Sequence, residues 1–196
     1  MNKLEVVEGY FYENEMIVVR DLIKLDVSKY FIYKFIKENN LVKVSKGIYI
    51  NDSTSADKMY LLQMKYPRIV FSHETALYLH GLIDRDPLAY SVAVPNGYNA
   101  TKLSRENVIV RYLDKNYADI GLGNKATVFG NEVYVYDKEK TICDMLKIET
   151  KVEKSVLTEG IKNYLNSKDR DLQRINKYAR KMKVEKKLKL YLRIIL

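Results

Sequence analysis

The stretch VSKYFIYKFIKENNLVKVSKGIYI, residues 27–50, changes its pattern at the midpoint. Wound at about 100° per residue, the first half gathers apolar residues on one side of a helix: Phe31, Ile32, Phe35 and Ile36. The other side is cationic and phenolic: Lys29, Tyr30, Tyr33, Lys34 and Lys37. The second half alternates around Ser45-Lys46-Gly47, which predicts a hairpin with a tight turn.

The residues before this stretch complete a small helical module. Apolar spacing predicts three elements: a helix over about 3–13, an extended segment at 16–18 and a helix over about 19–25. Ser28 is the predicted N-cap of the next helix, and Asn39-Asn40 ends it because asparagine tolerates the left-handed conformation of a C-cap. Three helices and a hairpin within about fifty residues predict a winged helix-turn-helix domain over residues 1–50.

A polar, turn-rich connector, NDSTSA at residues 51–56, separates this module from a second predicted domain over residues 57–196. The second domain is predicted to be mixed α/β and to end in a basic helical bundle, so the whole chain is α+β. Its predicted strands are 69–71, 90–94, 108–112, 126–129 and 132–136, and its first helices are 56–66, 73–80 and 138–146. Ser72 and Asp137 are the predicted N-caps of the last two of these helices.

Three further helices are predicted near the carboxyl end from their apolar stripes. The first stripe is Leu157, Ile161, Tyr164 and Leu165, and the second is Leu172, Ile175, Ala179 and Met182. The third is Val184, Leu188, Leu192 and Ile195. In each helix the lysines and arginines lie away from the stripe, as a solvated face requires.

The composition favours a cytoplasmic protein. The single cysteine, Cys143, allows no internal disulfide, which fits a reducing compartment. No apolar run approaches the roughly 20 residues of a membrane span, so no membrane association is expected. The sequence MNKLEVVEGYFYENE at residues 1–15 is acidic and amphipathic, unlike a secretory signal.

The formal net charge of +9 is unevenly distributed along the chain. Residues 151–196 hold fourteen Lys and Arg against five Asp and Glu, and residues 16–50 hold seven against three. Residues 51–150 are nearly balanced, with twelve against thirteen. Two positive regions of this kind favour a polyanionic partner, although a solvated lysine-rich surface would give the same totals.

Residues with catalytic chemistry are few. His73 and His80 lie seven residues apart on one predicted helix, and packing explains them better than a zinc site, which needs further ligands. Cys143 is interpreted as a small buried residue. Asp137, Glu139 and Asp144 suggest an alternative function as a metal-dependent nuclease, but the start of a helix also favours acidic residues. We therefore expect neither catalytic residues nor a metal or cofactor.

The polar face of the 28–38 helix fits the recognition helix of a helix-turn-helix module. Such a helix packs one side on its partners and lays the other in the major groove. Lysines contact phosphates or guanine edges, tyrosines offer a hydroxyl and a flat ring, and Ser28 with the first-turn amides can hold a phosphate. Lys43 and Lys46 would place positive charge on the wing. A winged helix that binds a protein instead is the other open interpretation.

A second cationic surface is expected on the carboxyl-terminal helices. Its members are Lys177, Arg180, Lys181, Lys186, Lys187, Lys189 and Arg193. This surface could lengthen a DNA footprint, or it could contact an RNA or an acidic partner.

Four phrases in this order resemble the AbiEi family of bacterial antitoxins: VSKGIYI, KYPRIVFSHETALYLHGL, VAVPNGYN and VYDKEKTICDML. The likeness covers nearly the whole chain. It implies an N-terminal winged helix-turn-helix domain joined to a C-terminal antitoxin domain. It also implies an autorepressor that binds inverted repeats in its own promoter and counters a co-encoded nucleotidyltransferase toxin without stable direct contact, the type IV arrangement of abortive infection systems.

By this resemblance the DNA-facing positions are the ones already named on the helix and the wing, with Arg20 added as a backbone contact. The resemblance gives no specific residues for antitoxin action. We expect a monomer that binds double-stranded DNA in pairs.

Overall fold

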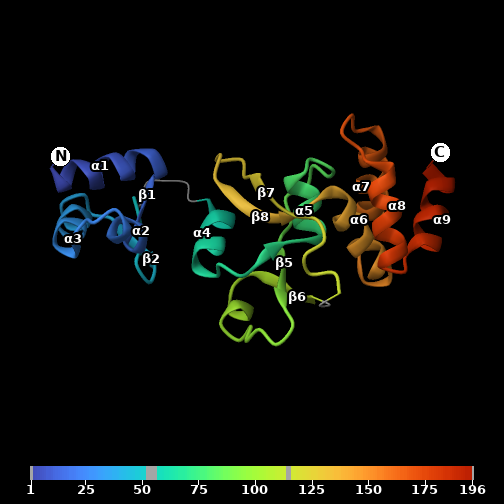
Figure 1. Cartoon of the computed structure of the whole chain (residues 1–196), viewed down its shortest axis with the longest axis horizontal. Helices are drawn as coiled ribbons and strands as arrows, with labels where there is room; N and C mark the ends of the chain where they lie inside the picture. Colours follow the sequence, from blue (N-terminus) through green and yellow to red (C-terminus); the bar gives the residue numbers. More distant parts are fainter. Residues whose placement is uncertain (1, 52–56, 114–115, 196) are drawn as a thin grey trace. The chain divides into compact units, whose positions relative to one another are not determined.

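The computed structural model describes residues 2–51, 57–113 and 116–195. The chain forms two compact units, Met1–Lys58 and Met59–Leu196, each with its own core (Figure 1). Helices and strands are mixed in both units, which agrees with the predicted α+β class. The predicted connector at 51–56 lies, apart from Asn51, outside the described residues.

The first unit follows the predicted order of elements closely. Its elements are α1 (Lys3–Asn14), β1 (Met16–Val18), α2 (Val19–Lys24), α3 (Lys29–Glu38), β2 (Val42–Ser45) and β3 (Ile48–Ile50). The three strands form an antiparallel sheet in the order β1-β3-β2. The extended segment before α2 is therefore not an isolated connection, because it pairs with the second strand of the hairpin.

Local signals at the ends of these elements are mostly satisfied. Asn2 and Glu5 form a capping box at the start of α1. Asn40 adopts a left-handed φ of 51° after α3, as predicted for the Asn39-Asn40 pair, and Gly47 adopts one of 74° in the predicted hairpin turn. Ser28 occupies the N-cap position of α3, but its side chain makes no capping hydrogen bond. Its hydroxyl group is thus not used to hold the helix.

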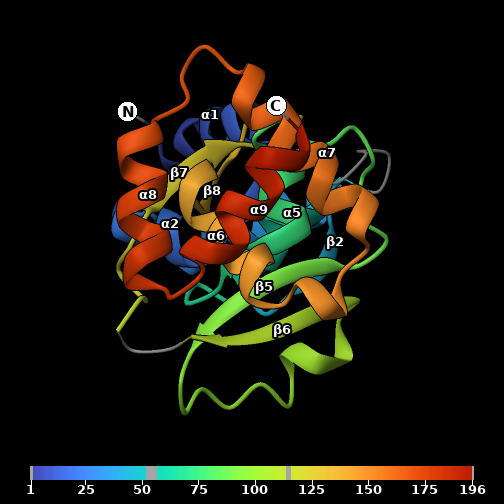
Figure 2. The ribbon, with the colours of Figure 1, turned by 90° about the vertical axis from the view of Figure 1, so that its right-hand side faces the viewer.

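The second unit contains a mixed sheet of five strands in the order β6-β5-β4-β8-β7. The strands are β4 (Val70–Phe71), β5 (Tyr90–Pro95), β6 (Val108–Leu113), β7 (Leu122–Ala126) and β8 (Glu132–Tyr136). The β5–β6 and β4–β8 pairs are parallel, and the other two pairs are antiparallel. Figure 2 shows β5 and β6 side by side, with β6 at the edge of the sheet.

Helices surround this sheet and continue beyond it. They are α4 (Lys58–Lys65), α5 (His73–Leu79), α6 (Lys138–Lys147), α7 (Lys154–Asn166), α8 (Leu172–Lys181) and α9 (Glu185–Ile195), with short 3₁₀ turns at Leu103–Arg105 and Glu149–Lys151. One apolar cluster joins α4 to the sheet through residues such as Leu62, Phe71 and Val94. A second cluster contains residues of all five helices from α5 through α9, and Ile142, Leu157 and Leu188 are fully buried in it. The carboxyl-terminal helices therefore share one core with α6.

Two details of the predicted second unit are wrong. The strand predicted at 126–129 is instead β7 at Leu122–Ala126, because Val128 and Phe129 are exposed in the turn that Thr127 and Asn131 close. Leu172, predicted on an apolar stripe, is exposed at the first position of α8.

Across the part of the chain that the structure describes, the helices are all too short or too polar to span a bilayer.

Candidate nucleic-acid interface

Helix α3 separates its two sides as predicted. Ile32, Phe35 and Ile36 are buried, and Phe31 is half-buried against the same core. The nine predicted contact residues of the first unit are all exposed: Arg20, Ser28, Lys29, Tyr30, Tyr33, Lys34, Lys37, Lys43 and Lys46. Tyr30 is 70% exposed and Tyr33 is 45% exposed, so two large aromatic rings of α3 lie open to a partner.

The buried side of α3 fixes the position of this face. The Phe35 ring packs on the Phe11 ring of α1, with centroids 5.5 Å apart. Ile32 is fully buried in a core that also contains Val7, Ile17 and Leu22. Residues from α1, β1 and α2 thus hold α3 in place, so its outer side chains project from a rigid element.

The cations of this face differ in how they are paired. Lys34 lies 3.8 Å from Glu38 on the same helix, and Arg20 lies 3.3 Å from its neighbour Asp21. Within residues 2–51 and 57–113, Lys29 and Lys37 on α3 form no ion pair, and neither do Lys43 and Lys46 of the hairpin. Unpaired lysines on a rigid face are available to neutralise phosphates.

Tyr49 on β3 is a member of this face that the sequence interpretation missed. Its ring meets the Tyr33 ring edge-on, with centroids 6.2 Å apart. Burial raises the pKa of Tyr49, and the neighbouring Tyr33 raises it further, so the phenol is protonated and can donate a hydrogen bond at neutral pH. The alternation of side chains along a strand could have indicated this, because it places Tyr49 on the opposite face of β3 from Ile48 and Ile50.

A second cationic surface lies between α8 and α9, where the structure has a groove of about 780 Å³. Its lining brings together four of the seven predicted cations: Lys177, Arg180, Lys181 and Lys189. Glu185 also lines the groove and pairs with two of them, at 3.0 Å from Lys189 and 3.8 Å from Arg180. The hydrogen bond from Lys189 lowers the pKa of Glu185, so this carboxylate stays charged and reduces the positive field of the groove.

The other three predicted cations of this region do not line the groove. Lys186 and Arg193 are exposed elsewhere on α9. Lys187 was wrongly predicted to face outward, since it is half-buried and its Nζ donates to the Leu146 carbonyl at 3.0 Å. It also pairs with Glu149 at 3.0 Å. Lys187 therefore binds the carboxyl-terminal end of α6, where a cation stabilises the helix.

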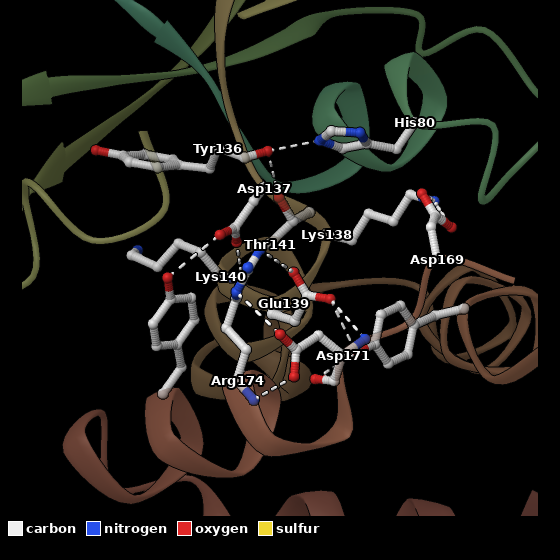
Figure 3. A network of polar contacts seen from close by, with 12 residues as sticks. His80, Tyr136, Asp137, Lys138, Glu139, Lys140, Thr141, Asp169, Asp171 and Arg174 are labelled. Carbon is white, nitrogen blue, oxygen red and sulfur yellow. Dashed lines mark hydrogen bonds and ion pairs between the residues drawn. The ribbon is translucent and has the colours of Figure 1, made fainter. Parts of the chain in front are cut away.

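The three carboxylates considered for a nuclease have separate partners, and Figure 3 shows those of Asp137 and Glu139. Asp137 caps α6 as predicted, accepting from the Lys140 amide at 2.7 Å. Glu139 accepts from the Tyr164 hydroxyl at 2.9 Å, and Asp144 pairs with the Lys140 side chain. Burial raises the pKa of both Asp137 and Asp144. Among the residues the structure describes, no three His, Cys, Asp or Glu side chains converge as metal ligands.

The two histidines and the cysteine have packing roles. His80 donates from Nε2 to the Tyr136 carbonyl at 2.7 Å, and His73 is buried with Nδ1 3.0 Å from the Ser72 hydroxyl. Burial, aided by nearby Arg111 and Lys140, lowers the pKa of His73 to about 3. Cys143 is fully buried, which confirms the interpretation of a small buried residue, and burial raises its pKa to about 12.

The segments FSHETALYLHGL and DKEKTICD form the central helices of the second unit. In α5, Thr75, Ala76 and Leu77 are buried, and in α6 all residues from 139 to 146 are buried. These segments therefore serve packing in this chain, and they offer little surface to a partner.

Comparison with models of protein families and with curated proteins gave no match. Among solved structures, the chain is similar to a crystal structure of the RV2827C protein from Mycobacterium tuberculosis, at 13% sequence identity and a TM-score of 0.49. The similarity covers 95% of this chain and 79% of that one. A likeness this remote carries no argument about function.

Proposed function

We propose that the first unit is a winged helix-turn-helix domain that binds duplex DNA, and that the chain represses its own operon. The observation that supports this most is the outer face of α3, where unpaired lysines and exposed tyrosines stand opposite a buried apolar side. In this proposal α3 is the recognition helix in the major groove, and the turn between β2 and β3 is the wing.

The residues of this face have distinct roles in the proposal. Lys29, Lys34 and Lys37 contact phosphates or base edges from α3, and the tyrosines contact sugar and phosphate. The free Ser28 hydroxyl and the first amides of α3 receive a phosphate at the helix N-terminus. The hairpin lysines follow the flanking backbone, and Arg20 adds a contact from α2.

The operator is proposed to be an inverted repeat that two copies occupy, one on each half-site. The groove between α8 and α9 is proposed as a second phosphate-binding surface. Its effect on affinity is smaller than that of α3, because Glu185 occupies two of its cations.

The proposed biological role is that of a cytoplasmic antitoxin of a type IV system. This part of the proposal comes from the resemblance to the AbiEi family, and its partner is a nucleotidyltransferase toxin that is countered without a stable complex. Co-expression with the toxin encoded beside this chain tests it. Growth rescue without co-purification agrees with the proposal, and a lack of rescue contradicts it.

Binding to the promoter duplex upstream of the coding sequence tests the repressor role. If six cations of the first unit each neutralise a phosphate, log K falls with log salt at a slope of roughly −5. Affinity that does not change with salt, or that equals the affinity for unrelated DNA, contradicts the proposal. Incubation of plasmid with the protein and Mg²⁺ separates the nuclease alternative, since a repressor shifts the band and leaves the DNA uncut.

A further inference from the structure

A groove of about 370 Å³ on the second unit has a chemistry opposite to that of the two cationic surfaces. The amino-terminal ends of α5 and α7, the loop at 83–89 and the edge strand β6 form it. Six of the residues that line it are apolar: Ile83, Pro87, Leu88, Ala89, Ile109 and Val156. Leu88 is 83% exposed and Ile109 is 40% exposed, so this apolar surface is open to a partner.

The rim of this groove is acidic on a chain of net charge +9. Glu74, Glu153 and Glu159 line it, against the single cation Arg85. Arg85 reaches only Glu153, at 3.9 Å, and both side chains are largely exposed. Glu159 forms no ion pair within the described residues. The occupant that suits such a groove carries two positive charges beside aliphatic side chains.

The outward face of α9 has this chemistry. Lys186, Leu190, Arg193 and Ile194 follow one another at helical spacing, opposite the fully buried Leu188. Leu190 is 56% exposed and Ile194 is 69% exposed. In the part of α9 that the structure describes, Lys186 and Arg193 form no ion pair, whereas Lys187 and Lys189 do. This face is also separate from the groove between α8 and α9, which Lys189 lines.

We propose that the acidic groove binds the outward face of α9 from a second copy of this chain. Leu190 and Ile194 cover the apolar lining residues, and Lys186 and Arg193 meet Glu153 and Glu159. An amphipathic helix in a groove is a common recognition mode. When each copy offers its α9 and its groove to the other, the two contacts are related by a two-fold axis and the assembly closes as a dimer.

The contact is weak in solution. Helix α9 has eleven residues and is only about 16 Å long. One face of it buries less than the roughly 1,600 Å² of a standard interface, even when the contact is made twice. Two copies held on neighbouring half-sites would have a high effective concentration, which strengthens such a contact. The dimer itself is independent of the proposed DNA binding, and it is tested without DNA.

Sedimentation velocity of the full chain over a hundredfold range of concentration, at low salt, measures the contact. The wild type is expected to shift from monomer to dimer, and added salt is expected to weaken the shift. Glu153→Lys/Glu159→Lys and Lys186→Glu/Arg193→Glu should each remain monomeric, because each sets like charges against each other. An equimolar mixture of the two variants restores both contacts and should form a heterodimer.

A matched control for Lys186→Glu/Arg193→Glu is Lys102→Glu/Lys125→Glu, which makes the same charge change at exposed positions away from both surfaces and should dimerise as the wild type does. Circular dichroism of each variant establishes that it is folded. A wild type that stays monomeric at every concentration overturns the proposal, and so does a mixture that fails to associate when both variants are folded. Capture of an unrelated cationic peptide by a groove that does not bind its own α9 overturns it as well.

Discussion

Helices α3 and α6 are alike in sequence and opposite in use. Each has ten residues and three lysines, and each carries a lysine four residues before an acid, Lys34–Glu38 and Lys140–Asp144. In α3 the three lysines are exposed. In α6, Lys140 is buried and Lys138 is held by Asp169 at 2.6 Å. Burial, which the pattern of charges does not reveal, decides whether a lysine supports the fold or stays available for a ligand.

Removal of the acid from each of the two pairs should give the largest difference between the helices. Burial raises the pKa of Asp144 although Lys140 lowers it, so for this carboxyl group the effect of desolvation exceeds the attraction of Lys140. Asp144→Ala leaves a buried cation unpaired and should lower the free energy of unfolding by about 3–5 kcal/mol. Glu38→Ala, at the exposed pair, should cost less than about 0.5 kcal/mol. Denaturant unfolding of both variants measures the difference.

The double variant Lys140→Met/Asp144→Leu sharpens this prediction. It removes both charges at similar volume and should recover most of the stability that Asp144→Ala loses. If Asp144→Ala lowers the free energy of unfolding by no more than Glu38→Ala does, then Lys140 and Asp144 are not shielded from water. The contrast between α3 and α6 would then be wrong.

The second largest effect should appear in the proposed DNA affinity, from α3 and not from α6. Lys29→Ala/Lys37→Ala removes two unpaired lysines and should weaken operator binding about 100-fold at low salt, or about 2.7 kcal/mol. The salt slope should fall by about two, and the free energy of unfolding should stay within about 0.5 kcal/mol. Fluorescence anisotropy at several salt concentrations measures both quantities.

Lys147→Ala in α6 is the matched control for this variant. Lys147 is exposed like the α3 lysines, but its Nζ lies 4.5 Å above the Tyr117 ring. Its removal should leave operator affinity and salt slope unchanged. A loss from Lys147→Ala equal to half that of the double variant, in units of free energy, would mean that the protein binds DNA through its overall charge, without a defined face.

The sequence was sufficient to predict which residues of α3 are buried, but it was insufficient to predict this for α6. In α3 the apolar residues occupy one side and every charged residue the other, so periodicity alone predicts burial, which the structure confirms. In α6 the stretch 139–146 is buried all round, because α5 covers one side and α7, α8 and α9 cover others. Most of those neighbours lie far away along the chain, so the local spacing shows that Lys140 and Asp144 can pair but not that the pair is buried.

The same limit explains the other errors of sequence interpretation. Val128 and Phe129 have high strand propensity, yet the hairpin turns there and the strand lies just before them at Leu122–Ala126. Strand alternation separates Tyr49 from its buried neighbour Ile48, but its contact with the Tyr33 ring of α3 appears only in the folded unit. Charge totals likewise made the carboxyl-terminal helices look freer than they are, since Glu149 and Glu185 pair with three of their cations.

A pH dependence should also separate the two units, because both histidines of the chain lie in the second. The folded pKa of His73 is lowered to about 3, below the value of about 6.5 in an unfolded chain. The unfolded state therefore takes up the proton first, so stability is complete above about pH 6.5 and falls as the pH falls. At pH 5 the loss from this residue is about 2 kcal/mol relative to neutral pH.

The variant His73→Asn isolates this contribution. His73 has a left-handed φ of 51°, which asparagine tolerates better than most residues. The stability difference between wild type and variant should change by about 2 kcal/mol between pH 7.5 and pH 5. Hydrogen exchange should show the loss of protection in α5 and α6 and not in α3. A difference that is constant with pH would mean that His73 is not held neutral by its surroundings.

The carbonyl groups at the carboxyl-terminal ends of α3 and α6 receive side-chain hydrogen bonds from different sources. This difference leads to the smallest of the expected effects on stability. In α3 the Asn39 side chain donates to the Phe35 carbonyl at 3.0 Å, so the end of the helix is closed locally. In α6 the Leu146 carbonyl receives its hydrogen bond from Lys187 of α9, forty-one residues away. Lys187→Ala should cost about 1 kcal/mol of unfolding free energy, through the lost bond and the lost cation at the helix end. The neighbouring Lys186→Ala removes an exposed lysine and should cost less than about 0.5 kcal/mol. Equal costs from the two substitutions would show that Lys187 behaves as a free surface lysine. Its hydrogen bond to the Leu146 carbonyl would then contribute nothing measurable to the stability of α6.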